Sequence, residues 1–297
     1  ALGTDTVMDA LKTPADIFSD GALYLRVYVF GLLFLFLYNV CTGIFNAMGD
    51  SRTPLVLLIL SSVSNVILDL VFVAVFHWGV AGVAWATFIA QGCAGVLAFL
   101  LLLRRVHAFD TGGHFLLFSF DMLRRLVGYG IPSIAQQSFV SVGNVIIQYY
   151  VNLCGATVIA GFSAATKVNM FALTCCMSFS SGLSSYVAQN IGANEPGRAR
   201  KALLYGILSS LAAGVLIAYV SFFHGSALAA VFARDAAVIS AAADYLRAYA
   251  IDCLLTSFLF CFMGYFNGCG KTFFVMVQGI AGAFAVRIPI SYFVSRI

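Results

Sequence analysis

The sequence GIFNAMG at residues 43–49 recurs as GYFNGCG at residues 264–270, with both end glycines, the phenylalanine and the asparagine in register. A second pair lies upstream at the same offset, where YLRVY at 24–28 matches YLRAY at 245–249. An apolar composition produces chance matches of Leu or Phe, but not two such motifs in one register. The chain therefore contains an internal repeat, which predicts two related halves.

The repeated motifs lie in a strongly apolar chain. Of its 297 residues, 62% are hydrophobic and 9% are charged, whereas soluble domains average about 45–50% apolar and about 25% charged residues. The chain has too few charged residues to cover a water-facing surface. The composition excludes a soluble enzyme, a disordered chain and a nucleic-acid-binding protein. The net charge of +4 is too small for a basic patch.

Apolar runs long enough to cross a membrane occur eight times. A helix that crosses the hydrocarbon core needs roughly 20 predominantly apolar residues. The segments that qualify are residues 22–48, 53–76, 79–103, 126–153, 157–190, 199–223, 244–268 and 272–295. No segment shows the alternating pattern of a barrel strand, and backbone groups in lipid must pair within their own segment. We therefore predict an all-α polytopic membrane protein.

Basic residues are concentrated in alternate loops of this arrangement. Nine Lys or Arg lie on the side that carries loops 49–53, 104–125, 190–201 and 269–272, against five on the other side. Loops rich in Lys and Arg stay in the cytoplasm. These four loops are therefore expected to be cytoplasmic, in a multi-pass protein of the cell membrane.

The repeat also predicts the domain organisation. Its two copies have the same orientation, and parallel repeats related by an axis along the membrane normal are typical of transporters. The first and second segments match the seventh and eighth, so three helices are expected before the chain and one after it. We predict a fold of two six-helix lobes with eight of twelve helices present. Residues 1–103 would end the first lobe, 104–125 connect the lobes, and 126–297 form most of the second.

Polar side chains inside spanning helices are costly, and each one needs a reason. Asp69 lies four residues after Asn65, so both side chains point the same way. Asn39 and Thr87 lie at matching depths on neighbouring segments. Together they predict an oxygen-rich cluster that holds Na⁺, chiefly at Asp69 and Asn65, or takes up a proton. The alternative is a hydrogen-bonded polar contact between helices. No other metal or cofactor is expected.

The second half carries further polar residues that are candidates for substrate contact or gating. They are Asp252, Lys167, Arg287, Gln136, Gln137 and Asn144. Structural roles are an alternative for each of them: an interfacial carboxylate, a cation beside a partner, or hydrogen bonds between helices. Pro132 is expected to kink the helix that carries Gln136, Gln137 and Asn144.

Enzyme motifs are weak. Residues 268–272, GCGKT, resemble the end of a phosphate-binding loop, but residue 265 is Tyr where that motif needs its first Gly, and a membrane helix precedes it. The four His lack a spacing for catalysis or metal binding. No nucleotide-binding domain is present in the sequence, so any transport by this chain is not driven by ATP.

Several ordered stretches resemble the multidrug and toxic compound extrusion (MATE) family. They are GDSRTP at 49–54, Asn65-x-x-Leu68-Asp69, GVAGVAWAT at 79–87, GIP at 130–132 and QNIGANEPGRAR at 189–200. The resemblance implies that the chain holds helices four to eleven of the twelve-helix family fold. It also implies export that is coupled to a cation. In the DinF-like branch, the positions of the first-lobe ion site match Asn39, Asn65, Asp69 and Thr87. Another branch of the family carries an acidic residue in helix seven and one in helix ten. The corresponding positions in this sequence are Val140 and a position near Thr256, so neither acid is matched.

The sequence thus predicts a monomeric secondary exporter that moves drug-like compounds across the lipid bilayer in exchange for Na⁺ or H⁺. The drug site is expected between the lobes, near the membrane midplane. Two alternatives stay open. One is a flippase for lipid-linked precursors, built on the same wider fold. The other is a membrane scaffold that does not transport. This alternative does not explain the internal repeat or the presence of Asp69 inside a spanning helix.

Overall fold

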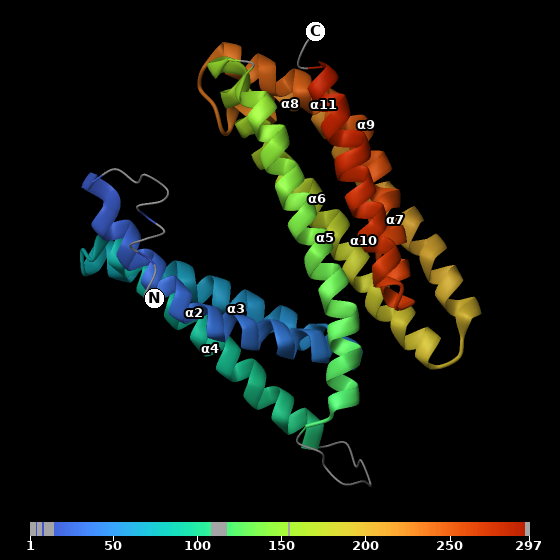
Figure 1. Cartoon of the computed structure of the whole chain (residues 1–297). Helices are drawn as coiled ribbons and strands as arrows, with labels where there is room; N and C mark the ends of the chain where they lie inside the picture. Colours follow the sequence, from blue (N-terminus) through green and yellow to red (C-terminus); the bar gives the residue numbers. More distant parts are fainter. Residues whose placement is uncertain (1–3, 5–7, 9–14, 108–117, 154, 295–297) are drawn as a thin grey trace. The chain divides into compact units, whose positions relative to one another are not determined.

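The computed structural model describes residues 4 and 8 and the ranges 15–107, 118–153 and 155–294. These residues form long helices joined by short turns (Figure 1). The chain divides into two compact units, Ala1–Phe115 and Leu116–Ile297. The boundary between the units falls within the predicted connector at 104–125. The assignment of each unit to a six-helix lobe stays a prediction.

In the described part of the first unit, three helices are long and apolar enough to span a membrane. They are α2 (Ala15–Ala47), α3 (Arg52–Leu70), which a π-helical turn η1 (Val71–Val75) continues, and α4 (Gly79–His107). Helices α2 and α4 approach closely, because a Cβ atom at Gly95 would lie 2.8 Å from the carbonyl oxygen of Phe34. Small residues permit such approaches between membrane helices. A buried cluster joins the three helices at Cys41, Phe45, Leu57, Ala98 and Leu102.

The second unit is built around α9. Its elements are α5 (Phe120–Asn152), α6 (Ala156–Gly192), α7 (Pro196–Phe223), α8 (Gly225–Ala230), α9 (Ala236–Gly268), α10 (Thr272–Ala281), η2 (Gly282–Arg287) and α11 (Ile288–Val294). Helix α9 packs against both α6 and α7, and α5 packs against α10. Gly264 lies directly against the backbone of Ser180, and a Cβ atom at Gly268 would lie 2.6 Å from the carbonyl oxygen of Ser184.

The repeated motif forms the same turn in both units. Gly49 follows α2 with a φ of 81°, and Gly270 follows α9 with a φ of 74°. Asn194 takes the same role after α6, with a φ of 59°. A matching backbone bond closes each turn: Asp50 N–H to Phe45 carbonyl (2.9 Å), Lys271 N–H to Phe266 carbonyl (2.8 Å) and Glu195 N–H to Asn190 carbonyl (2.8 Å). This is the Schellman type of helix end, which needs a left-handed residue and thus favours Gly or Asn.

All eight predicted segments are helical, and seven of them are long and apolar enough to cross a bilayer within the described chain. Helix α5 is the exception: it is long enough, but it is less apolar than the other seven helices. Gln136, Gln137, Asn144 and Gln148 lower the hydropathy of this helix. Pro132 lies inside α5, which continues on both sides of it, and the kink expected there stays a prediction.

Candidate functional site

A polar stripe runs along α3 in the first unit. Ser61, Asn65 and Asp69 follow one another at intervals of four residues, which places them on one face of the helix. The side-chain amide of Asn65 donates to the hydroxyl oxygen of Thr87 on α4, at 3.5 Å. The Ser61 hydroxyl donates to the carbonyl oxygen of Ala90, at 3.2 Å. The stripe therefore faces α4, and two of the four predicted coupling residues meet there.

A cavity of about 210 Å³ opens beside this contact. All three helices of the first unit line it, and its walls are Leu35, Tyr38, Leu58, Ser61, Ser62, Asn65, Thr87, Ala90, Gln91 and Ala94. Its polar atoms are oxygens and amides without a carboxylate. The sequence prediction missed Tyr38, Ser61, Ser62 and Gln91. Helical spacing is the signal that would find two of them, because Ser61 lies one turn before Asn65 and Gln91 one turn after Thr87.

Asp69 lies one turn beyond Asn65 and just before η1. Its side chain is half-buried. The oxygen Oδ1 is buried and has no hydrogen-bond partner among the residues that the structure describes. A π-helical turn such as η1 is often found at functional sites. The arrangement therefore leaves one carboxylate oxygen able to accept a proton or to coordinate a cation.

Asn39 does not join the cluster. Its side-chain amide donates to the carbonyl oxygen of Leu35 on the same helix, at 2.8 Å, and the residue is exposed. Asn39 is also absent from the cavity lining. The local bond to the preceding turn competes with any contact across to α3 or α4. The structure therefore brings Asn65 and Thr87 together, with Asp69 one turn away and Asn39 apart.

In the second unit, α5 meets η2 through one predicted pair. A guanidinium N–H of Arg287 donates to the side-chain oxygen of Asn144, at 3.5 Å. Gln136 packs against α10, where a Cβ atom at Gly279 would lie 3.0 Å from the Gln136 side chain. Gln137 is exposed on α5. The polar residues of α5 thus split between contacts to neighbouring elements and an outward face.

The two remaining candidates each have a local partner. Asp252 is exposed, and its Oδ2 accepts a hydrogen bond from the Thr256 hydroxyl at 3.3 Å. Lys167 is exposed, with Nζ 5.7 Å from the ring centroid of Phe232. A cation over an aromatic face at this distance is attracted by the ring. Neither residue lines the cavity beside Asn65 and Thr87.

Comparison with families of known proteins gives two matches. The MatE family model matches residues 132–293, which is more than half of the chain. The model of the lipid II flippase MurJ matches residues 15–150.

Individual relatives of the chain include proteins named for multidrug resistance. Two proteins of Bacillus subtilis, the Probable multidrug resistance proteins YpnP and YoeA, are each 29% identical to the chain. The alignments cover 66% and 75% of this chain but 43% and 50% of the relatives. The chain therefore spans about half the length of the curated relatives that it matches.

A solved structure shares the fold. The outward-facing conformation of a multidrug resistance MATE family transporter of the MOP superfamily superimposes with a TM-score of 0.88 at 20% identity. The superposition covers 99% of this chain and 67% of the other. At this identity the likeness establishes the fold alone.

Proposed function

Because the chain belongs to the MatE family of multidrug efflux transporters, we propose that the protein exports amphipathic, often cationic compounds in exchange for Na⁺ or H⁺. The multidrug resistance relatives support the export of drug-like compounds. The polar stripe on α3 supports the exchange. An apolar bundle has no structural need for a carboxylate, and intramembrane carboxylates commonly mark ion or proton pathways.

The observation that carries the coupling proposal is the buried Oδ1 of Asp69, which lacks a partner among the described residues. In this proposal Asp69 binds or releases the coupling ion. Asn65 and Thr87 supply neighbouring oxygen atoms, and Asn39 joins them only after it gives up its bond to Leu35. A bound ion shifts the balance between two states of a transporter only if it binds one state more tightly. Occupation of Asp69 would favour the state that releases the drug.

The test uses the natural gene that encodes this chain, expressed in cells that lack their own drug exporters. Cells loaded with a fluorescent lipophilic cation are followed as a Na⁺ or H⁺ gradient is imposed. We expect gradient-driven efflux with the wild-type gene, and efflux near the level of cells without the gene for Asp69→Asn. The amide keeps the shape of the side chain but removes the charge that an ion exchanges with.

Asp244→Asn is the matched control. The Asp244 side chain is 69% exposed and pairs with Arg247 on the same helix at 3.2 Å. Such surface pairs contribute about 0–1 kcal/mol, so this variant should export like the wild type. Equal amounts of protein in the membrane are checked by immunoblot. Undiminished efflux by Asp69→Asn would remove the coupling role, and no efflux by the wild type would remove the export proposal.

The match of residues 15–150 to the lipid II flippase MurJ favours one second candidate, the movement of a lipid-linked precursor. The same cells distinguish the two functions. A flippase would leave the fluorescent cation inside and would instead bring a labelled lipid-linked oligosaccharide to the outer leaflet, where an impermeant reagent modifies it.

A further inference from the structure

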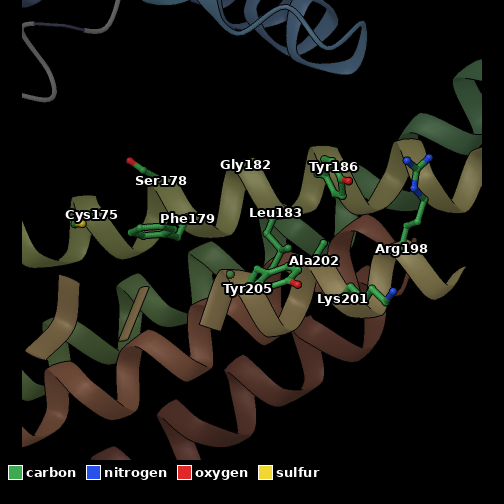
Figure 2. Close-up of a pocket in the computed structure, with 11 residues that line it drawn as sticks. Cys175, Ser178, Phe179, Gly182, Leu183, Tyr186, Arg198, Lys201, Ala202 and Tyr205 are labelled. Atoms are coloured by element: carbon green, nitrogen blue, oxygen red, sulfur yellow. The ribbon is translucent and has the colours of Figure 1, made fainter. Parts of the chain in front are cut away.

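A groove of about 780 Å³ runs between α6 and α7 on the second unit (Figure 2). Two glycines form it, Gly182 on α6 and Gly206 on α7. No atom lies within 4 Å of the place where a Gly182 side chain would begin, so the space beside it is open. Leu183 is buried and forms the floor. The groove is formed by the second unit alone, whereas the polar stripe on α3 belongs to the first unit.

The lining changes character along the groove. Phe179 and Cys175 lie at one end, and Arg198 and Lys201 lie at the other, near the start of α7 (Figure 2). In the part of the chain that the structure describes, neither cation forms an ion pair with an acidic side chain. The groove therefore has an apolar end and a positively charged end whose two cations have no ion-pair partner among the described residues.

Two tyrosines line the groove closer to the charged end. Tyr186 is 49% exposed and Tyr205 is 65% exposed. Tyrosine is enriched where a membrane meets water, because its ring sits at the level of the lipid headgroups. Their position and that of the two cations are consistent with a groove that opens at the membrane surface.

The length of the groove matches one leaflet. Its lining on α6 runs from Cys175 to Tyr186, which at a rise of 1.5 Å per residue is roughly 17 Å. The hydrocarbon core is roughly 30 Å thick, so the groove reaches from one surface to about the middle of the bilayer. The charged end adjoins loop 190–201, which the distribution of basic residues assigns to the cytoplasm.

We propose that this groove binds one anionic phospholipid of the cytoplasmic leaflet. The lipid phosphate pairs with Arg198 and Lys201, and one acyl chain lies along Phe179 and Leu183. Basic pockets between membrane helices on the cytoplasmic side attract anionic headgroups, and Arg presents a fork of donors that fits a phosphate. A zwitterionic lipid brings no net charge to offset the two cations. The proposal does not depend on transport or on Asp69.

The test reconstitutes the whole protein into nanodiscs of phosphatidylcholine that contain a phosphatidylglycerol with a photoactivatable acyl chain. After illumination, crosslinked peptides are identified by mass spectrometry. We expect crosslinks on α6 and α7 at the groove. An excess of unlabelled phosphatidylglycerol should suppress them, and an excess of phosphatidylcholine should not.

Two variants separate charge from shape. Arg198→Gln combined with Lys201→Gln should lower groove labelling roughly 25-fold, because each basic residue near an anionic surface contributes roughly a factor of five. Arg104→Gln combined with Arg105→Gln removes the same charge from the end of α4 and should leave labelling unchanged. Gly182→Leu keeps both cations but fills the open space, and should abolish labelling.

Gly128→Leu is the control for added bulk, because a side chain there also meets no atom within 4 Å, on α5. Size-exclusion profiles and unfolding temperatures establish that each variant is folded. If the charge variant fails to fold, the comparison of Gly182→Leu with Gly128→Leu decides alone. The proposal is overturned by equal labelling from photoactivatable phosphatidylcholine, by no labelling of the groove in folded protein, or by displacement of the lipid by a transported drug.

Discussion

At the scale of single residues, Asp50 organises the turn between α2 and α3. Its Oδ1 accepts hydrogen bonds from the backbone N–H groups of Arg52 (3.2 Å) and Thr53 (3.1 Å), and its Oδ2 accepts one from the Thr53 hydroxyl (2.8 Å). The Thr53 bonds and the nearby charge of Arg105 hold the pKa of this carboxyl below its usual range. These bonds satisfy N–H groups that the start of a helix leaves without partners.

This pKa shift predicts a pH-dependent contribution to stability. A carboxyl whose pKa is lowered by folding stabilises the protein above its unfolded pKa, about 3.9, and loses that effect as the pH falls through the lower folded value. Asp50→Asn should therefore lower the unfolding temperature at pH 7, by an amount equivalent to about 0.3–1 kcal/mol. Thermal unfolding in detergent at pH 7, 5 and 3.5 follows the difference, which should shrink at the lowest pH. A constant difference would mean that the charge of Asp50 has no part in it.

The predicted coupling residues show how far a sequence reveals a site. Asn65 and Thr87 do meet, as predicted. This contact was predictable because helical spacing and depth in the membrane are both readable in the sequence. Asn39 has comparable depth but bonds its own helix, a choice of rotamer that spacing does not encode. Gln91 and Tyr38 escaped prediction because neutral polar residues are common in membrane helices, and only the rotation of each helix decides which of them face a cavity.

At the scale of helices, two glycines of α4 face the same residue of α2 at different distances. A side chain at Gly95 would begin 2.8 Å from the backbone oxygen of Phe34, whereas one at Gly92 would begin 3.7 Å from the Phe34 ring. The first distance is a clash with backbone, and the second is ordinary contact.

Gly95→Ala should therefore destabilise the protein, and Gly92→Ala should not. Overpacking a close contact costs about 1–3 kcal/mol, which lowers the unfolding temperature in detergent. Alanine also suits a helix better than glycine, so Gly92→Ala should leave the unfolding temperature equal or slightly higher. Equal effects of the two substitutions would show that α2 and α4 do not approach as closely as the structure indicates.

Hydropathy located all eight helices, but it did not reveal which of their faces pack. On α2 the side chain of Leu33 is 71% exposed and that of Phe45 is 2% exposed, although both are large and apolar. Lipid and protein interior are equally apolar, so no amphipathic pattern separates the two environments. The π-helical turn η1 was also not predictable, because residues 71–75 read VFVAV and contain no Gly or Pro to mark it.

At the scale of the whole molecule, the repeat and the charge distribution predict the direction of every helix. The turns at Gly49 and Gly270 share one geometry, and the sequence places both in the cytoplasm. The repeat was readable because its motifs include the residues of the turn itself. Outside this turn motif and the upstream YLRVY and YLRAY pair, the two copies share little more than apolarity.

This topology predicts which side of the membrane each turn faces. Ser51→Cys and Glu195→Cys should react with an impermeant maleimide only after the cells are permeabilised, whereas Arg234→Cys should react in intact cells. All three positions are exposed, and labelling is measured above that of the unsubstituted protein. The reverse pattern would invert the orientation, and a mixed pattern would break the alternation of helices.

The polar character of α5 has a consequence for biogenesis. A nascent segment with five amide side chains partitions poorly from the translocon into lipid when it emerges alone. Its neighbour α10, which packs against Gln136, and η2, whose Arg287 bonds Asn144, are synthesised much later. We therefore expect α5 to reside stably in the bilayer only after α10 and η2 have been synthesised.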